Sequence, residues 1–198
     1  MSIEALAGGD FGSPRFSPET AALARIIKSR AKRLPARVLV FGCGDGRSAA
    51  QLAVSLDADV TGIERRPRFD PAAELYATLR ACDPPPLRFA DGAFDFVYSH
   101  QNFEHVASLR ASLSEMRRVL ARGGGFCLKL PARRGFTSAE LRSELISAFG
   151  EALDVTQPYY EERHKEFSRL SRAWWSSALG SSLVPSRYFV GRRTDLRR

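Results

Sequence analysis

The chain has 198 residues, of which 44% are hydrophobic and 26% charged, a composition that fits one globular domain and excludes a disordered chain. No apolar run is long enough to cross a bilayer, and residues 1–18 lack the basic and apolar segments of a signal peptide. The formal net charge is +8, and the three cysteines form neither a zinc motif nor a disulfide framework. This cysteine usage predicts a reducing, cytoplasmic setting.

The positive charge is concentrated in two segments. Residues 24–37 carry six Lys or Arg and no acid, and residues 162–198 carry nine basic residues against three acids. Basic segments of this kind suit nucleic acid, acidic lipid or a phosphorylated substrate, but an ordinary solvated surface also explains them. No basic run is interleaved with aromatic residues for base stacking, which favours the ordinary surface.

The chain opens with a predicted flexible leader, residues 1–16, followed by a single domain over residues 17–198. Ser17-Pro18-Glu19 is a typical helix start, with a capping hydroxyl, a proline in the first turn and an acid near the positive end. The pattern predicts a helix that ends at Pro35. Its apolar face consists of four residues: Leu23, Ile26, Ile27 and Leu34.

Strands and helices then alternate. Short apolar runs predict strands at 38–41, 60–63, 76–81, 94–98 and 126–130, with two final strands at 153–157 and 187–192. Helices are predicted around 48–54, from Leu109 to a stop at Gly123-Gly124, and from Thr137 to Phe149. This alternation predicts an α/β fold with a mainly parallel sheet, in which ligands bind at the carboxyl ends of the strands.

The distinctive residues follow the ends of these strands. Gly42-Cys43-Gly44-Asp45-Gly46 forms a tight loop after the first strand, where glycines allow the backbone to approach a ligand. Arg47 stands where a dinucleotide fingerprint requires its third glycine, and no P-loop lysine follows. Glu64 ends the second strand, where its carboxylate can accept hydrogen bonds from ribose hydroxyls. Asp83 ends the third, where it is placed to accept from an adenine amine.

Four segments in this order resemble class I S-adenosylmethionine-dependent methyltransferases. They are Val38–Gly46, Phe89–Val97, Phe103-Glu104-His105-Val106 and Glu115–Gly124. The resemblance implies a Rossmann-like fold with a seven-stranded, mostly parallel sheet, an antiparallel last strand and helices on both faces. It divides the domain into a cofactor-binding core, 36–131, and a variable substrate-side region with the final strands, 132–198.

The resemblance also implies S-adenosyl-L-methionine as the cofactor. The residues expected to contact it are Gly42, Cys43, Gly44, Asp45, Gly46, Glu64, Asp83, Ser99, His100 and Gln101. The stretch between the second and third strands is short, so the usual second helix is short or missing, and Asp83 is a weaker expectation than Glu64. Asp91 is a rival acid, although in the family it belongs to a turn.

The chemistry is expected after the fourth strand. His100 is the first candidate for a general base, because it follows the strand directly and histidine titrates near neutral pH. Glu104 and His105 are further candidates. Some relatives hold a divalent metal with an E-x-x-E-H pattern, but this chain has Gln101 at the first position, so no metal is expected.

The predicted function is methyl transfer to an O or N atom of a small molecule such as a metabolite, sugar or natural product. One alternative is an RNA or other polyanion methyltransferase that uses the basic ends. Another is a related protein that binds the cofactor or a partner without catalysis. The acceptor and the oligomeric state are not encoded in any motif of the sequence.

Overall fold

The computed structural model describes residues 17–30, 33–82, 86–100, 109–131, 138–156 and 186–194. They form a seven-stranded sheet in the order β3-β2-β1-β4-β5-β7-β6. The strands are β1 (Arg37–Phe41), β2 (Asp59–Glu64), β3 (Thr78–Ala81), β4 (Phe94–His100), β5 (Leu120–Pro131), β6 (Leu153–Asp154) and β7 (Ser186–Arg192). Strands β1 to β5 pair in parallel, and β7 pairs antiparallel with β5 and β6. The predicted fold class is therefore confirmed.

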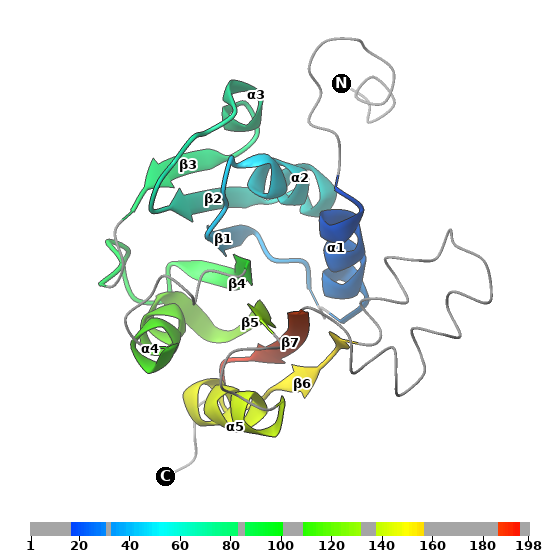
Figure 1. Cartoon of the computed structure of the whole chain (residues 1–198), viewed down its shortest axis with the longest axis vertical. Coiled ribbons are helices and arrows are strands. Elements are labelled where there is room, and N and C mark those ends of the chain that lie inside the picture. Colours follow the sequence, from blue (N-terminus) through cyan, green and yellow to red (C-terminus); the bar gives the residue numbers. More distant parts are fainter. Residues whose placement is uncertain are drawn as a thin grey trace, which may run out of the picture.

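Helices cover both faces of the sheet (Figure 1). They are α1 (Pro18–Arg30), α2 (Arg47–Leu56), α3 (Pro71–Glu74), α4 (Leu109–Val119) and α5 (Ser138–Phe149). Alternate residues of β1 divide between two cores, because successive strand side chains point to opposite faces. Val38 and Val40 pack with α1 and α2, whereas Leu39 packs with α4 and α5. None of the helices in the described ranges has the length and apolarity to cross a membrane.

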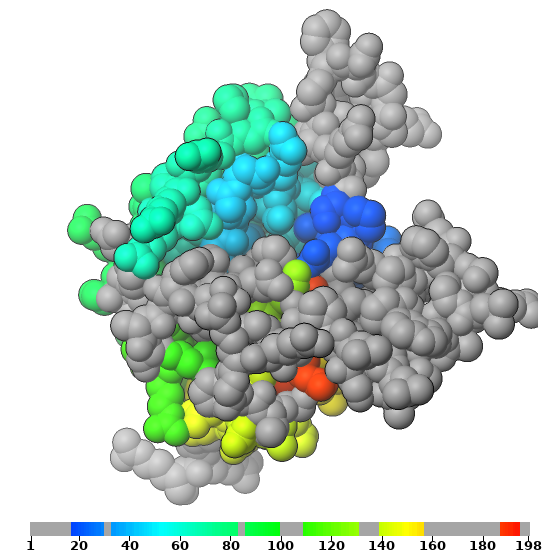
Figure 2. All heavy atoms as spheres, in the orientation of Figure 1, coloured from blue at the N-terminus to red at the C-terminus, as the bar shows by residue number. Residues whose placement is uncertain are grey.

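Helix α1 begins where the sequence predicted. The backbone N–H of Thr20 donates to the Ser17 hydroxyl at 3.5 Å, and the Gln51 side chain bonds the Ser17 backbone from α2. These bonds join α1 to α2, and the two helices lie side by side (Figure 2). The predicted end at Pro35 is wrong, since α1 ends at Arg30. Leu34 therefore lies beyond the helix and is 44% exposed.

The end of α4 also differs from the prediction. The helix stops at Val119 and β5 begins at Leu120, so Gly123-Gly124 lies within the strand rather than after the helix. The register with β4 shifts inside this stretch. A Cβ on Gly124 would lie 2.9 Å from the Asp95 carbonyl oxygen, so the close approach of β4 and β5 requires glycine there. A bulge at this point explains why a helix-stop pattern was misleading.

The connection between β2 and β3 is short, as the sequence predicted. Helix α3 is a single turn, capped by the Asp70 side chain, which accepts from the backbone N–H of Ala72 at 3.0 Å. The backbone N–H of Tyr76 still bonds Ala73, so the predicted start of the third strand at Tyr76 is wrong and β3 begins at Thr78. The compact crossover brings Asp70 back to the glycine loop, where its backbone N–H donates to the Asp45 carbonyl at 2.8 Å.

Candidate functional site

The glycine loop joins the end of β1 to the start of α2. Gly42, Gly44 and Gly46 all have positive φ, at 80°, 58° and 89°, which residues other than glycine rarely adopt. The backbone N–H groups of Gly42 and Cys43 both donate to the Ile63 carbonyl, at 2.8 and 3.1 Å. These bonds fix the loop against the carboxyl end of β2, as a parallel sheet with a ligand site at that edge requires.

Two of these glycines face different surroundings. A Cβ on Gly46 would lie 2.2 Å from Cδ1 of Leu79 in β3, so any side chain at this position would displace the Leu79 side chain. A Cβ on Gly44 would meet nothing within 4 Å. Gly46 is therefore needed for packing, whereas Gly44 presents its backbone to open space that a ligand can enter.

Glu64 lies beside this open part of the loop. One carboxylate oxygen accepts from the backbone N–H of Gly44 at 2.9 Å, and the other accepts from that of Arg65 at 2.8 Å. The side chain is half-buried. The oxygen bonded to Arg65 also accepts from the backbone N–H of Arg66 at 3.4 Å, whereas the oxygen bonded to Gly44 retains a lone pair that can accept from a ligand hydroxyl. The structure thus brings together the loop and the carboxylate that the sequence singled out.

An ion-pair cluster supports the loop from its outer side. Arg47 Nε donates to Asp70 at 2.7 Å, and its backbone N–H donates to Asp45 at 3.1 Å. The guanidinium of Arg47 lowers the pKa of the Asp70 carboxyl. In the sequence, Arg47 stood out only as a departure from the dinucleotide fingerprint, and Asp70 was not identified. The capping-type sequence Asp70-Pro71 was the available signal.

Ser99 contributes a buried hydroxyl next to the loop. It pairs in register with Phe41, the last residue of β1, and is fully buried. Its Oγ has no hydrogen-bond partner among the described residues. A buried hydroxyl without a partner is costly, and a ligand atom at the site is one way to satisfy it.

The Cys43 thiol is buried in the loop. Burial is the largest cause that raises its pKa to about 12, and the charge of Glu64 adds to it. The thiol is therefore protonated at neutral pH, and its side chain packs in the apolar cluster beneath the loop.

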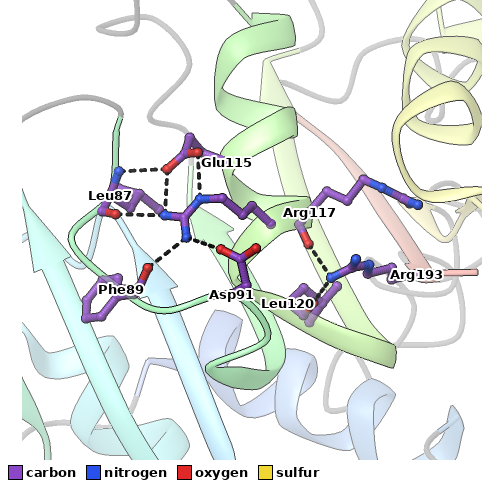
Figure 3. A network of polar contacts seen from close by, with 8 residues as sticks. Leu87, Phe89, Asp91, Glu115, Arg117, Leu120 and Arg193 are labelled. Atoms are coloured by element: carbon purple, nitrogen blue, oxygen red, sulfur yellow. Dashed lines mark hydrogen bonds and ion pairs between the residues drawn. The ribbon is translucent and has the colours of Figure 1, made fainter.

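Asp91, the rival acid, lies in the turn before β4 and is engaged by the protein itself. Arg118 NH1 contacts its carboxylate at 2.7 Å and also donates to the Phe89 carbonyl. Glu115 and the Leu87 carbonyl complete this network, so that Leu87, Phe89, Asp91 and Glu115 all contact the same guanidinium (Figure 3). Asp91 thus ties the turn to α4.

Several predicted site residues cannot be placed against this geometry. Asp83, Gln101, Glu104 and His105 lie outside the described residues. His100 ends β4, where its backbone pairs in register with Lys129 of β5. Within the described ranges, no group of three or more His, Cys, Asp or Glu side chains is placed to hold a metal.

Sequence reasoning missed one polar cluster at the carboxyl end of β5. Lys129 and Glu19 form an ion pair, and the Tyr188 hydroxyl donates to the same Glu19 oxygen at 2.8 Å. The Lys129 ammonium also lies 5.7 Å from the centre of the Tyr188 ring. These residues come from α1, β5 and β7, so no local pattern could reveal them.

Sequence comparisons point to one family. Residues 39–128 match the family model of a methyltransferase domain. An O-methyltransferase of Penicillium expansum is 33% identical over 97 residues, which are 43% of this chain and 34% of that protein. A ubiquinone biosynthesis O-methyltransferase of Cereibacter sphaeroides is 36% identical over 95 residues, 44% of this chain and 38% of that protein. The chain therefore spans well under half the length of these curated relatives.

The structural comparison agrees. An S-adenosylmethionine dependent methyltransferase of Mesorhizobium loti matches with a TM-score of 0.64 and 15% identity, over 89% of this chain and 100% of that one. This likeness establishes the Rossmann-like fold of class I methyltransferases. Together with the match of residues 39–128 to a methyltransferase domain, it confirms the resemblance to class I S-adenosylmethionine-dependent methyltransferases that was inferred from the sequence.

Proposed function

We propose that this chain binds S-adenosyl-L-methionine and transfers its methyl group to an oxygen or nitrogen atom of a small molecule. The observation that carries the proposal is the meeting of three features on neighbouring strands: the open backbone at Gly44, the Glu64 carboxylate bonded to it, and the unpartnered Ser99 hydroxyl. Acidic and hydroxyl groups suit a neutral nucleoside that carries a sulfonium, whereas a pyrophosphate would be repelled.

The roles follow from the position of each residue. Backbone groups of the loop, Gly42 to Gly46, line the cofactor, and Glu64 accepts from the ribose hydroxyls. Asp83 is assigned to the adenine amine, and Ser99, His100 and Gln101 to the side on which the methyl group lies. His100 is the proposed base, with Glu104 and His105 as further candidates, and no metal is assigned.

Bound cofactor would supply a methyl group on a positively charged sulfur, a good leaving group for in-line displacement. The protein's task is then to hold the acceptor atom close to the methyl carbon and in line with it, which can supply much of the rate. A base is needed only when the acceptor atom carries a proton that must leave. The named relatives are O-methyltransferases, which favours oxygen as the acceptor atom.

A small molecule is the proposed partner, and the reducing, cytoplasmic setting inferred from the cysteines remains a prediction. The RNA or polyanion alternative draws only on the basic segments 24–37 and 162–198. Strong salt dependence of substrate binding would favour it over a small neutral acceptor. The non-catalytic alternative would bind the cofactor without turning over any acceptor.

Calorimetric titration with S-adenosylmethionine and S-adenosylhomocysteine tests the cofactor assignment. Glu64→Gln keeps the shape of the side chain and removes its charge, while Asp59→Asn makes the same change at the opposite end of β2. We expect micromolar binding that weakens about tenfold or more in Glu64→Gln and is unchanged in Asp59→Asn. Absence of binding of either compound to folded protein would overturn the proposal. Acceptors are then sought in metabolite pools, at low and high salt, by the release of S-adenosylhomocysteine.

A further inference from the structure

A cavity of about 750 Å³ lies at the edge of the sheet opposite the candidate cofactor site. Its lining includes Ala36, which precedes β1, Phe96 near the start of β4, and Gly125 in the early part of β5. Arg192, at the end of the antiparallel β7, completes this edge. These positions are the amino ends of the parallel strands, whereas the glycine loop, Glu64 and Ser99 lie at the carboxyl ends. The proposed function therefore leaves the cavity without a role.

Arginine dominates the charge of this cavity. Arg33, Arg122 and Arg192 line it, together with the carboxylates of Asp95 and Glu151. Asp95 is already held by a residue outside the lining, because Arg37 NH2 donates to it at 2.8 Å and lowers the pKa of its carboxyl. The lining thus contains three arginines and two carboxylates, and one of these carboxylates pairs with an arginine outside the lining.

The two basic segments of the sequence meet here. Arg33 belongs to segment 24–37 and Arg192 to segment 162–198, which are far apart in the chain. In the fold, the later turns of α1 lie beside β7 and β6 (Figure 1). Each of these elements contributes to the cavity lining. Ile27 comes from α1, Leu153 from β6 and Val190 from β7, and Arg33 and Leu34 follow α1. One arginine from each basic segment therefore lines the same cavity.

Apolar side chains supply the remaining walls. Leu34 and Leu153 are 44% and 45% exposed, and both line the cavity. They are two of the four exposed large hydrophobic residues among those that the structure describes. Two of the four exposed large hydrophobic residues in the described ranges thus line the cavity that three arginines also line. Exposed apolar surface concentrated in a concavity is typical of a ligand site.

We propose that this cavity binds a small amphipathic anion, a free molecule with one phosphate, sulfate or carboxylate head and an apolar body. The arginines match the head, because guanidinium groups bind such anions with charge-assisted hydrogen bonds. Leu34, Leu153 and the neighbouring apolar walls match the body. The volume lies in the range of ordinary small-molecule sites. A nucleic acid fits less well, since it requires an extended basic track with stacking aromatics.

The proposal is tested with dodecyl phosphate, titrated calorimetrically into the full chain below the micelle concentration of the probe. We expect micromolar binding that weakens about tenfold in Arg192→Gln and in Arg122→Gln. Arg110→Gln is the matched control, because Arg110 lies on α4, pairs with Glu144 and is not in the cavity lining. Leu34→Asp tests the apolar wall independently of the arginines, and thermal unfolding verifies that each variant is folded.

Three comparisons distinguish this cavity from the cofactor site, from a surface that binds any alkyl chain and from a membrane-binding surface. Saturating S-adenosylhomocysteine and the Glu64→Gln variant should leave dodecyl phosphate binding unchanged, because the two sites lie at opposite edges of the sheet. Dodecyl maltoside, with the same chain and an uncharged head, should bind at least tenfold more weakly. Competition with S-adenosylhomocysteine, equal binding of dodecyl maltoside, or full binding in both arginine variants would each overturn the proposal. So would binding to anionic phospholipid vesicles without binding to the free probe.

Discussion

The Glu64 carboxylate accepts a hydrogen bond from the backbone N–H of Gly44 at 2.9 Å, so the end of β2 and the loop after β1 form one unit. This relationship predicts that the length of the side chain matters as well as its charge. Glu64→Asp keeps the charge but withdraws the carboxylate by one methylene from the Gly44 N–H. We expect S-adenosylhomocysteine binding to weaken about tenfold, as in Glu64→Gln. Asp59→Glu is the control, and calorimetry that finds equal affinity in Glu64→Asp would contradict the assignment.

The glycine loop gives a second prediction, because Gly44 and Gly46 differ in their surroundings. Gly46→Ala places a Cβ 2.2 Å from Leu79 Cδ1 at a φ of 89°, whereas Gly44→Ala meets nothing within 4 Å at a φ of 58°. Positive φ alone costs about 1–2 kcal/mol. We expect Gly44→Ala to lower the free energy of unfolding by that amount and Gly46→Ala to lower it further. Urea unfolding measures both.

A compensating variant separates the clash from the backbone strain. Leu79→Ala removes the two Cδ atoms that a Cβ on Gly46 would meet most closely, so Gly46→Ala should cost less free energy of unfolding in that background than in the wild type. Equal costs in the two backgrounds would show that packing against β3 does not explain why position 46 is glycine. The Gly44→Ala variant should fold and yet lose cofactor affinity, since its methyl group enters the open space beside Glu64.

The Arg118 network gives a third prediction, on stability. Arg118 bonds Glu115 and Asp91 and donates to the carbonyls of Leu87 and Phe89, so Arg118→Met leaves several partners without a donor. We expect a loss of about 2 kcal/mol of unfolding free energy. Arg110→Gln breaks an ion pair whose arginine side chain is 79% exposed, and it should cost well under 1 kcal/mol. Denaturant unfolding of both variants is the measurement.

The same network predicts the direction of a pH effect. The hydrogen bond from Arg118 is the largest cause that lowers the pKa of the Glu115 carboxyl below its ordinary value of 4.5. A carboxyl whose pKa is lower in the folded than in the unfolded state stabilises the fold at any pH above its unfolded-state pKa. That stability is lost as the pH falls through the folded-state pKa. Glu115→Gln should therefore flatten the loss of stability below pH 4.5. An unchanged acid slope in this variant would contradict the assignment.

The cysteines give a fourth prediction. Burial raises the pKa of Cys43 to about 12 and raises the pKa of Cys127 as well, and both side chains are buried. Thiolate is the reactive form, so neither should react with a disulfide reagent such as dithionitrobenzoate in the native protein. Cys82 is only partly buried and should react first. Native protein should thus titrate one fast thiol and unfolded protein three, with Cys82→Ser abolishing the fast phase.

Much of this architecture could be predicted from the sequence because its signals are local. The apolar run before Gly42 and the glycines after it fixed the first strand and the loop, and strand parallelism then placed Glu64 beside them. The helix-stop interpretation of Gly123-Gly124 failed because those glycines serve a bulge between β4 and β5, and glycine spacing alone does not distinguish a helix end from a close strand contact. The ion pairs of Asp70 with Arg47 and of Arg118 with Asp91 join residues far apart in the chain, and no local pattern encodes such pairing.

The ion pair between Lys129 and Glu19 joins residues that are 110 positions apart in the chain, and it gives the last prediction. Its side chains are only 10% and 21% exposed. Removing one partner of a buried pair leaves an uncompensated charge, which typically costs about 3–5 kcal/mol, whereas replacing both costs much less. Lys129→Met should therefore be strongly destabilising, and adding Glu19→Gln should recover part of the loss.

A double-mutant cycle in denaturant unfolding measures this coupling. Tyr188→Phe removes only the hydroxyl that donates to Glu19, so it should cost about 1 kcal/mol and leave the ion pair in place. The exposed pair of Arg110 and Glu144 is the matched comparison and should show a coupling well under 1 kcal/mol. If Lys129→Met and the double variant proved equally unstable, the pair would not be coupled, and the attachment of α1 to β5 would rest on apolar packing alone.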